Sequence, residues 1–269
     1  MAAICLQEVS VCFPIYDGVS RSLKNRIVTA STGGRISAVS GQPTVVNALD
    51  GVSFRIEHGD RVALIGHNGA GKTTLLRVLA GIYIPVRGRV RRTGKVAPLF
   101  DTGFGMDPDA TGYENIRLRA LYLGMSKAQL AERVEEIADF AELGSFLGMP
   151  LRTYSAGMQT RLAFAVSTSI DPEILLLDEQ IGAGDAAFMV KASERLEKLV
   201  QRSGILVLAS HSDDAVQRFC TKAIVLEHGR VKFYGPSEEA LEVYRDHHSS
   251  AAATRQNRGA EAAADPRPT

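Results

Sequence analysis

The stretch Gly66-His-Asn-Gly-Ala-Gly-Lys-Thr73 decides how this chain folds. It matches the pattern G-x-x-x-x-G-K-[ST], follows the apolar run Arg61 to Ile65, and opens a predicted helix from Thr73 to Ala80. Its glycines let backbone N–H groups close around phosphate oxygens, and the helix N-terminus adds partial positive charge. An incidental glycine turn would not place a strand, a loop and a helix in this order. The sequence therefore predicts a phosphate-binding loop.

The side chains of this loop indicate which ligands it takes. The Lys72 ammonium would reach the β- and γ-phosphates of a nucleotide, and the Thr73 hydroxyl would hold Mg²⁺. Thr74 can also reach a phosphate. The predicted nucleotide-binding residues of this segment are Gly66, His67, Asn68, Gly69, Ala70, Gly71, Lys72, Thr73 and Thr74.

A second motif, Ile174-Leu-Leu-Leu-Asp178-Glu179, consists of four apolar residues followed by two acids. A buried strand would carry Asp178 to the carboxyl edge of the sheet, where it would act as a Mg²⁺ ligand. Glu179 would then lie by the γ-phosphate, where a carboxylate can orient or deprotonate the attacking water. Two acids after an apolar strand more often begin a helix, but the phosphate-binding loop favours the catalytic interpretation.

Apolar patterns place the other elements. Residues 4–12 and 52–57 alternate apolar and polar positions, as half-buried strands do, and 205–209 forms another apolar strand. Strands that alternate with helices predict an α/β fold around a mostly parallel sheet. The basic segment Arg87 to Lys95 reads as a hairpin with a solvated edge, and a second hairpin is expected around Glu-His-Gly-Arg at 227–230.

The segment from about 103 to 160 is nearly all helical, so we expect an inserted helical subdomain there. Within it, Ser126 with Gln129 three residues later forms a capping-box signature for a helix N-terminus. The tail 249–269 is rich in alanine with scattered charges, and we expect it to be disordered.

Composition narrows the class of protein. The chain has 269 residues, and its 31 Lys+Arg against 30 Asp+Glu give a net charge of +1, which argues against a nucleic-acid partner. No apolar run approaches the roughly 20 residues that span a bilayer. Three cysteines fit no metal or disulfide spacing and suit a reducing compartment. We therefore expect a cytoplasmic chain whose membrane role, if any, comes through a partner.

Three further segments resemble motifs of the ABC ATPase family. Tyr154-Ser-Ala-Gly-Met158 is similar to the signature, usually L-S-G-G-Q, with Ser155 and Gly157 matching and Ala156 and Met158 departing. Gly182-Ala-Gly-Asp185 resembles the D-loop, and Ser210-His211 resembles the switch histidine at a strand end. The resemblance covers about residues 4–245. It implies a P-loop NTPase fold over 4–248, with a mostly parallel core sheet, an antiparallel β-subdomain and the helical insertion.

What this resemblance implies is an ATP hydrolase that uses Mg²⁺. Ser155, Ala156, Gly157, Met158 and Asp185 would close over the ATP bound by a second copy in a head-to-tail dimer. In addition, His211 would contact the γ-phosphate, and Glu179 and His211 would be the catalytic residues.

Two positions of the family pattern stay open. The adenine-stacking aromatic residue would be Phe13, with Tyr16 as the alternative. The glutamine of the Q-loop is absent, and Asp101 or the neighbouring Thr102 would take its place, with Asp101 as the predicted metal ligand.

Finer motifs resemble one subgroup, the ATP-binding subunits that export lipid-linked polysaccharides such as O-antigen, capsule, teichoic acid and galactan. They are Tyr154–Met158 with Arg161-Leu-Ala-Phe-Ala-Val, Gly105-Met-Asp-Pro, Thr111-Gly-Tyr-Glu-Asn115, and 178–188. The subgroup implies a peripheral subunit on the cytoplasmic face of the cell membrane, bound to two copies of a multi-spanning permease. An importer or drug-exporter subunit is the alternative, and a soluble ABC ATPase acting in DNA repair or translation is a third.

Overall fold

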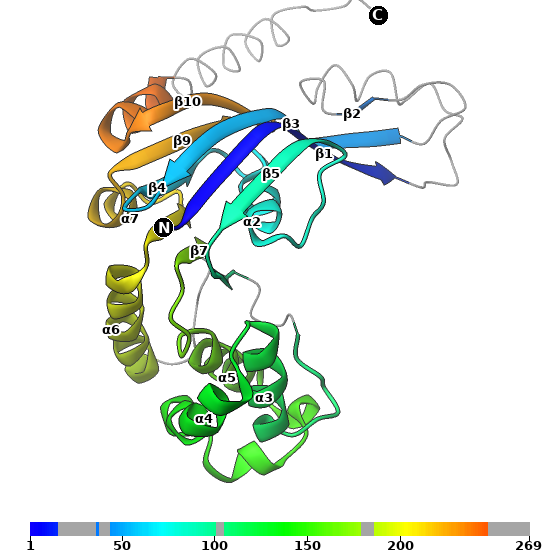
Figure 1. Cartoon of the computed structure of the whole chain (residues 1–269), viewed down its shortest axis with the longest axis vertical. Coiled ribbons are helices and arrows are strands. Elements are labelled where there is room, and N and C mark those ends of the chain that lie inside the picture. The colour runs from blue at the N-terminus through cyan, green and yellow to red at the C-terminus, as the bar shows by residue number, and fades with distance from the viewer. Residues whose placement is uncertain (16–35, 38–43, 101–104, 179–185, 247–269) are drawn as a thin grey trace, which may run out of the picture.

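The computed structural model describes residues 1–15, 36–37, 44–100, 105–178 and 186–246, and Figure 1 shows two sheets above a group of helices. The first sheet is antiparallel and has the strand order β2-β3-β1-β5. Its strands are β1 (Ala3–Ile15), β2 (Ile36–Ser37), β3 (Thr44–Glu57) and β5 (Arg87–Thr93). This sheet is the predicted antiparallel β-subdomain.

The second sheet has the order β10-β9-β4-β8-β7-β6, and all its pairs are parallel except that of β9 with β10. Its strands are β4 (Arg61–Ile65), β6 (Val96–Leu99), β7 (Ile174–Asp178), β8 (Ile205–Ala209), β9 (Lys222–Glu227) and β10 (Arg230–Pro236). The central strands are buried on both faces, which explains their continuous apolar runs. The predicted mostly parallel core sheet is confirmed.

Helices cover both faces of the parallel sheet. Helix α2 (Lys72–Ala80) packs its leucines between this sheet and the antiparallel one, in a core that also contains Val62 and Val207. Helices α6 (Ala186–Arg202) and α7 (Asp213–Phe219) cover the opposite face. Alternate residues of β4, β7 and β8 point into the two cores, so the sheet holds the ends of its strands at fixed spacing.

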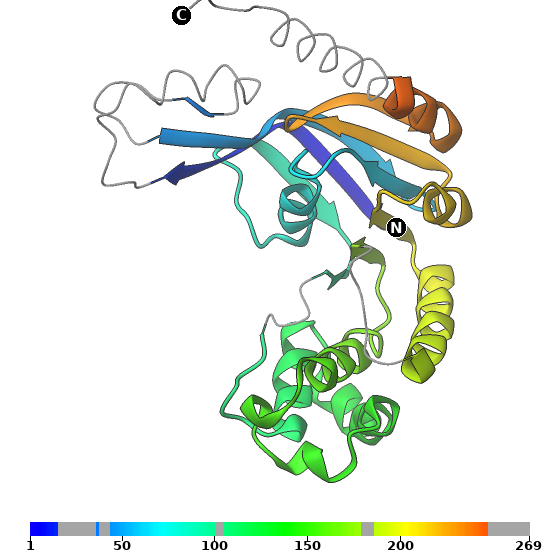
Figure 2. The ribbon, with the colours of Figure 1, turned by 180° about the vertical axis from the view of Figure 1, so that it is seen from behind.

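A helix over residues 237–246 follows β10. A further group of helices lies between β6 and β7 in the sequence and has a core of its own, built around Ile116, Ile137 and Leu162. They are α3 (Gly112–Tyr122), α4 (Lys127–Ala141), η1 (Gly144–Gly148), η2 (Leu151–Thr153) and α5 (Ala156–Ser167), and we call residues 112–167 the helical subdomain. Figures 1 and 2 show it as a separate body below the sheets. None of the described helices combines the length and the apolarity needed to cross a membrane.

Local signals differ in how well they predicted the structure. The capping box before α4 is confirmed, because Gln129 N–H donates to Ser126 Oγ (3.3 Å) and Ser126 N–H donates to Gln129 Oε1 (3.0 Å). The β9–β10 hairpin is also confirmed, with positive φ angles at both turn residues, His228 and Gly229.

The hairpin expected at Arg87 to Lys95 is wrong. Strand β5 pairs with β1 in the antiparallel sheet, whereas β6 pairs with β7 in the parallel sheet. Gly94, with a φ of 111°, lies where the chain leaves one sheet for the other. The apolar residues after it, Ala97 and Leu99, are buried in the core that also contains residues of α6 and α7. Their burial favours pairing of β6 with the parallel sheet over pairing with β5. The tail 249–269 lies outside the described residues.

Candidate active site

The predicted phosphate-binding loop follows the carboxyl end of β4, and the β9–β10 turn is hydrogen-bonded to it. Gly229 N–H donates to the Ala70 carbonyl (2.9 Å), and Ala70 N–H donates to the His67 carbonyl (2.9 Å). A Cβ atom on Gly66 would lie 2.4 Å from the Leu226 carbonyl oxygen, so only glycine allows this close approach. The loop is therefore shaped by its neighbours before any ligand arrives.

Gly71 is the N-cap residue of helix α2, has a φ of 113° and provides no side-chain cap. A Cβ there would lie 2.8 Å from the Ala48 carbonyl, and the left-handed backbone would strain any other residue. The first turn contains no acidic residue. Its N–H groups and the positive end of the helix are thus left for an external anion.

Lys72 lies in the first turn of α2 and folds back over the loop. Its ammonium donates to the carbonyl of Gly66 and approaches that of His67 at 3.4 Å. Burial lowers the pKa of Lys72, and the nearby Asp178 carboxylate partly opposes this. A half-buried cation whose charged form is disfavoured gains from a second anion, so the residue suits a phosphate ligand.

Thr73 and Asp178 meet across the edge of the parallel sheet. Thr73 Oγ1 donates to Asp178 Oδ2 at 3.5 Å, although the two residues are 105 positions apart. Strand β8 lies between β4 and β7, so the ends of two non-adjacent strands converge on one point. A hydroxyl and a carboxylate are oxygen ligands of the kind that Mg²⁺ prefers, and they therefore fit the predicted metal.

The predicted His211 follows the intervening strand β8. Ser210 before it is buried, donates its N–H to the Leu64 carbonyl (3.3 Å) and accepts the Ser212 N–H on its hydroxyl (3.0 Å). These bonds tie the end of β8 to β4, and His211 is exposed beyond them. The three predicted motifs therefore end at the same edge of the sheet.

Phe13 lies on β1 with 37% of its surface exposed. The ring of Tyr83 contacts it edge-on, with centroids 5.3 Å apart, and Tyr83 accepts a hydrogen bond from Arg77 (3.1 Å). Phe13 is thus supported from one side and open on another, as a stacking residue must be.

The predicted signature residues lie elsewhere in the molecule. Ser155 caps α5 by accepting the Met158 N–H on its hydroxyl (3.2 Å), and both Ser155 and Ala156 are exposed, while Gly157 is half-buried. The preceding Tyr154 is buried, and its hydroxyl donates to the Phe146 carbonyl (2.6 Å). Figures 1 and 2 show α5 in the helical subdomain, apart from α2. One copy of the chain therefore does not join its signature to its own phosphate-binding loop.

Known proteins resemble this chain in sequence and in fold. Residues 49–182 match the sequence pattern of the ABC transporter family. The O-antigen export system ATP-binding protein RfbE of Yersinia enterocolitica is 49% identical over 231 residues, which cover 86% of this chain and 97% of that protein. The chain belongs to the ABC transporter family.

A second relative and a solved structure are also similar to this chain. The teichoic acids export ATP-binding protein TagH of Bacillus anthracis is 39% identical over 197 residues, or 73% of this chain and 36% of that protein. The dimeric post-hydrolysis structure of the ATP-binding cassette MJ0796, bound to ADP and Pi, superposes with a TM-score of 0.62 at 23% identity. That superposition covers 87% of this chain and 98% of the cassette, and it shows that the fold is that of an ATP-binding cassette.

Several predicted site residues are not among those that the structure describes. The catalytic candidate Glu179, the D-loop residue Asp185 and the metal candidate Asp101 lie outside the described residues. The same holds for the alternatives Thr102 and Tyr16. Their roles stay predictions that rest on sequence.

Asn115, which was named above only as part of a family motif, has a structural role that the sequence did not predict. The Asn115 side chain on α3 is fully buried, and it is hydrogen-bonded to the backbone of the loop that precedes the helix. Its amide donates to the carbonyls of Asp107 (2.9 Å), Ala110 (3.1 Å) and Thr111 (3.0 Å), and its oxygen accepts the Asp107 N–H (2.7 Å). Asn115 thereby fixes the loop at the entrance to the helical subdomain. A buried asparagine four residues after a helix cap carries no sequence signal that would reveal these bonds.

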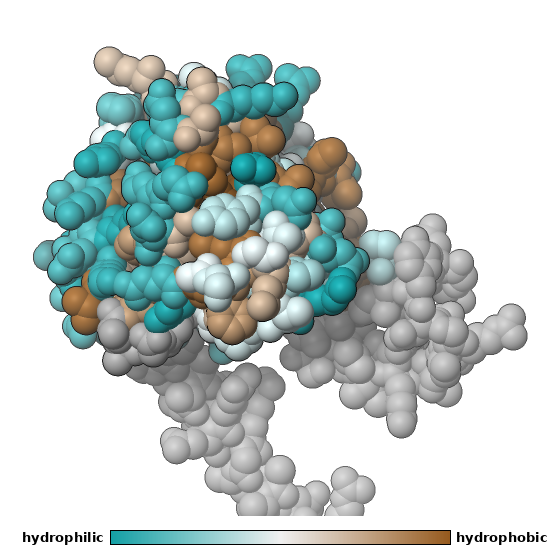
Figure 3. All heavy atoms as spheres, turned by 90° about the horizontal axis from the view of Figure 1, so that it is seen from below, coloured by the Kyte–Doolittle hydropathy of each residue, from teal (hydrophilic) through white to brown (hydrophobic). Residues whose placement is uncertain are grey.

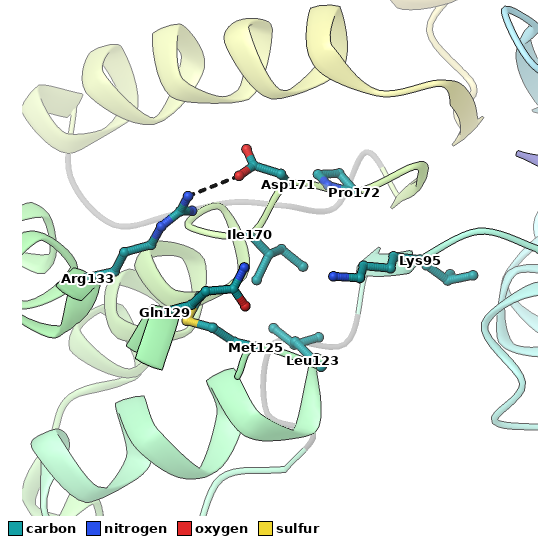
Figure 4. A pocket seen from close by; sticks show the side chains of 10 residues that line it. Lys95, Leu123, Met125, Gln129, Arg133, Ile170, Asp171 and Pro172 are labelled. Carbon is teal, nitrogen blue, oxygen red and sulfur yellow. Dashed lines mark hydrogen bonds and ion pairs between the residues drawn. The ribbon is translucent and has the colours of Figure 1, made fainter. Parts of the chain in front are cut away.

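A small pocket of about 60 Å³ lies where the helical subdomain meets the parallel sheet (Figure 4). Arg133 of α4 spans it with an ion pair to Asp171 (3.0 Å), while Lys95 and Gln129 line its wall. No residue of the phosphate-binding loop lines it, so this pocket belongs to the junction between subdomains and not to the nucleotide site.

Proposed function

We propose that the chain is the ATP-binding and ATP-hydrolysing subunit of an ABC exporter that moves a lipid-linked polysaccharide across the cytoplasmic membrane. The observation that carries the proposal is the convergence of Lys72, Thr73 and Asp178 at one edge of the parallel sheet. Relatives named for O-antigen and teichoic acid export support the class of cargo.

ATP would bind with its phosphates on the loop Gly66–Thr73, against the uncapped end of α2. Lys72 would exchange its contacts with loop carbonyls for the β- and γ-phosphates, and such charge-assisted bonds are stronger than neutral ones. Thr73 and Asp178 would hold Mg²⁺, which when bound neutralises charge on the phosphate oxygens. Phe13 would stack on the adenine while its ring stays packed against Tyr83.

Hydrolysis would then depend on groups at the same edge. Glu179 follows Asp178 directly in sequence, and its carboxylate would orient or deprotonate the water that attacks the γ-phosphate. His211, at the end of the neighbouring strand, would donate to the γ-phosphate or to that water.

Separation of the signature from the phosphate-binding loop supports a dimer of two copies arranged head to tail. Ser155 to Met158 would complete the nucleotide site of the second copy, with Asp185 beside them. The Ser155 hydroxyl uses a lone pair to cap α5, so its O–H remains able to donate to a phosphate of the second copy's ATP.

A membrane partner is supported by the surface of the helical subdomain. Leu118, Leu121 and Tyr122 of α3 are exposed, and Tyr122 lies beside Gly105 of the preceding loop. Figure 3, which views the molecule from below, shows apolar groups among hydrophilic ones on this side. We infer that a multi-spanning permease docks here, so that two copies of this chain would meet two copies of the permease at the cytoplasmic face of the membrane.

Glu179→Gln tests the catalytic assignment. The variant keeps the binding groups and loses the water-activating carboxylate, so hydrolysis should fall by roughly 10²–10⁴ while ATP binding persists. Phosphate release measures the turnover, and size-exclusion chromatography with ATP should show a trapped dimer. Glu173→Gln, an acid at the other end of the same strand region, is the matched control and should hydrolyse ATP normally. Near-normal turnover of Glu179→Gln would remove Glu179 from the mechanism.

A further inference from the structure

Strand β5 carries a row of arginines that the nucleotide site does not use. Arg87, Arg89 and Arg91 are all exposed, and β5 is the edge strand of the antiparallel sheet. Arg89 and Arg91 share the face that points away from the core, because Val90 packs into the core and Arg92 donates to the Leu79 carbonyl of α2 (3.0 Å). We call these three residues the arginine row.

None of the described acidic side chains forms an ion pair with the arginine row. Its cross-strand partners on β1 are Ser10, Gln7 and Cys5, and no ion pair between described residues reaches any of the three guanidinium groups. The nearby Glu8 carboxylate accepts a hydrogen bond from Ser53 on the side of β3 (2.9 Å). Because the whole chain has a net charge of only +1, this row is a local concentration of positive charge.

Two strongly exposed apolar side chains precede the row. Ile84 is 87% exposed and Val86 is 59% exposed, in the short loop between α2 and β5. We call these two residues the apolar tip. The loop is firmly held, because Val86 N–H donates to the Ser10 carbonyl (2.9 Å) and Ile82 N–H donates to the Arg77 carbonyl (2.9 Å). These hydrogen bonds hold the backbone of the loop in place, and the apolar tip projects into solvent from it.

Basic residues alone would suit an edge strand that avoids pairing with other chains. The apolar tip does not fit that explanation, since it exposes surface that favours association. Guanidinium groups beside exposed aliphatic side chains are the combination found where proteins lie on anionic bilayers, with the cations at the headgroups and the aliphatic groups at the acyl boundary.

We propose that the arginine row and the apolar tip form a contact surface for the anionic lipid headgroups of the membrane. The partner is the bilayer itself, so the contact is separate from docking on the permease. It rests on the proposed function only for the closeness of the chain to a membrane. Its role would be to hold the antiparallel sheet against the bilayer.

The test uses the full chain and vesicles, without permease or ATP. Wild-type protein should sediment with vesicles of phosphatidylcholine mixed with phosphatidylglycerol, and not with phosphatidylcholine alone, and salt should weaken the binding. Replacing Arg87, Arg89 and Arg91 by Gln should lower the partition coefficient by about fivefold per arginine, or about a hundredfold together. The control replaces three other exposed cations, Arg117, Lys127 and Lys198, by Gln and should keep most of the binding.

Two further measurements locate the contact. Ile84→Ser with Val86→Ser should weaken vesicle binding, and unchanged binding would overturn the part of the proposal that involves the apolar tip. Equal losses in the arginine-row variant and its control would overturn the proposal. So would competition by inorganic phosphate beyond the effect of chloride at equal ionic strength, because the row would then be a site for a free anion. ATP hydrolysis should persist in every variant, so failure of the lipid contact leaves the proposed catalytic function standing.

Discussion

Helices α2 and α5 both begin directly after a short motif of small residues, yet their first turns are completed differently. The N-cap residue of helix α2 is Gly71, in the left-handed region, and no side chain caps the helix. Helix α5 starts at Ser155 in the extended region, and the serine hydroxyl accepts the Met158 N–H. Neither first turn contains an acid, so the positive end of each helix is available to an anion.

This difference in capping indicates that the two helices would bind a phosphate in different ways. At α2 no side chain caps the first turn and Lys72 is adjacent, so a bound phosphate would complete the helix. At α5 the serine already caps the helix without a ligand, so a phosphate could bind only to the serine O–H and the positive end of the helix. We infer that α2 binds nucleotide within one chain, whereas α5 adds the weaker contact that a second chain can make and release.

The largest effect on the isolated chain is expected from Lys72→Ala. Loss of a charge-assisted contact costs about 1.5–3 kcal/mol, which corresponds to a decrease in ATP affinity of roughly 10- to 150-fold. Isothermal titration calorimetry measures it directly. Lys127→Ala, in the first turn of α4, is the matched control and should bind ATP as the wild type does. Unchanged affinity of Lys72→Ala would contradict the assignment of the phosphate-binding loop.

A smaller effect is expected from Gly71→Ala. The residue has a φ of 113°, and its new Cβ would lie 2.8 Å from the Ala48 carbonyl, so the free energy of unfolding should fall by about 1–3 kcal/mol. Chemical denaturation measures this change. Gly148→Ala is the matched control, because nothing lies within 4 Å of its Cβ position. Equal stability of the two variants would show that α2 does not need the left-handed start.

The smallest effect on the isolated chain is expected from Ser155→Asp. Aspartate caps helices as well as serine does, so the free energy of unfolding should change by less than about 0.5 kcal/mol. The carboxylate cannot donate to a phosphate and repels it, so ATP-dependent dimerisation should be lost, as measured by analytical ultracentrifugation. Ser155→Thr keeps both the cap and the donor and should dimerise. Normal dimerisation of Ser155→Asp would place the signature outside the shared site.

Much of this molecule could be predicted from local sequence. Strands β4 and β8 have the expected bounds, β7 extends one residue further than expected, and the cap at Ser126 was recognisable from residue type and spacing alone. Prediction failed at β5 and β6, where charge and glycines suggested one hairpin and the two strands joined different sheets. The roles of Asn115 and of the apolar tip also went unnoticed, because both depend on what surrounds a side chain in space.

By itself, the sequence determined the parts that short-range chemistry controls. The glycines of 66–71 allow a left-handed, closely packed loop, and the apolar run before them requires a buried strand, whatever the rest of the chain does. Only the tertiary structure decided which motifs meet. The strand order β4-β8-β7 brings Asp178 to Thr73 across 105 residues, whereas a separate core for α3, α4 and α5 keeps Ser155 away from them. Both outcomes follow from burial of apolar surface between distant segments, which no local pattern encodes.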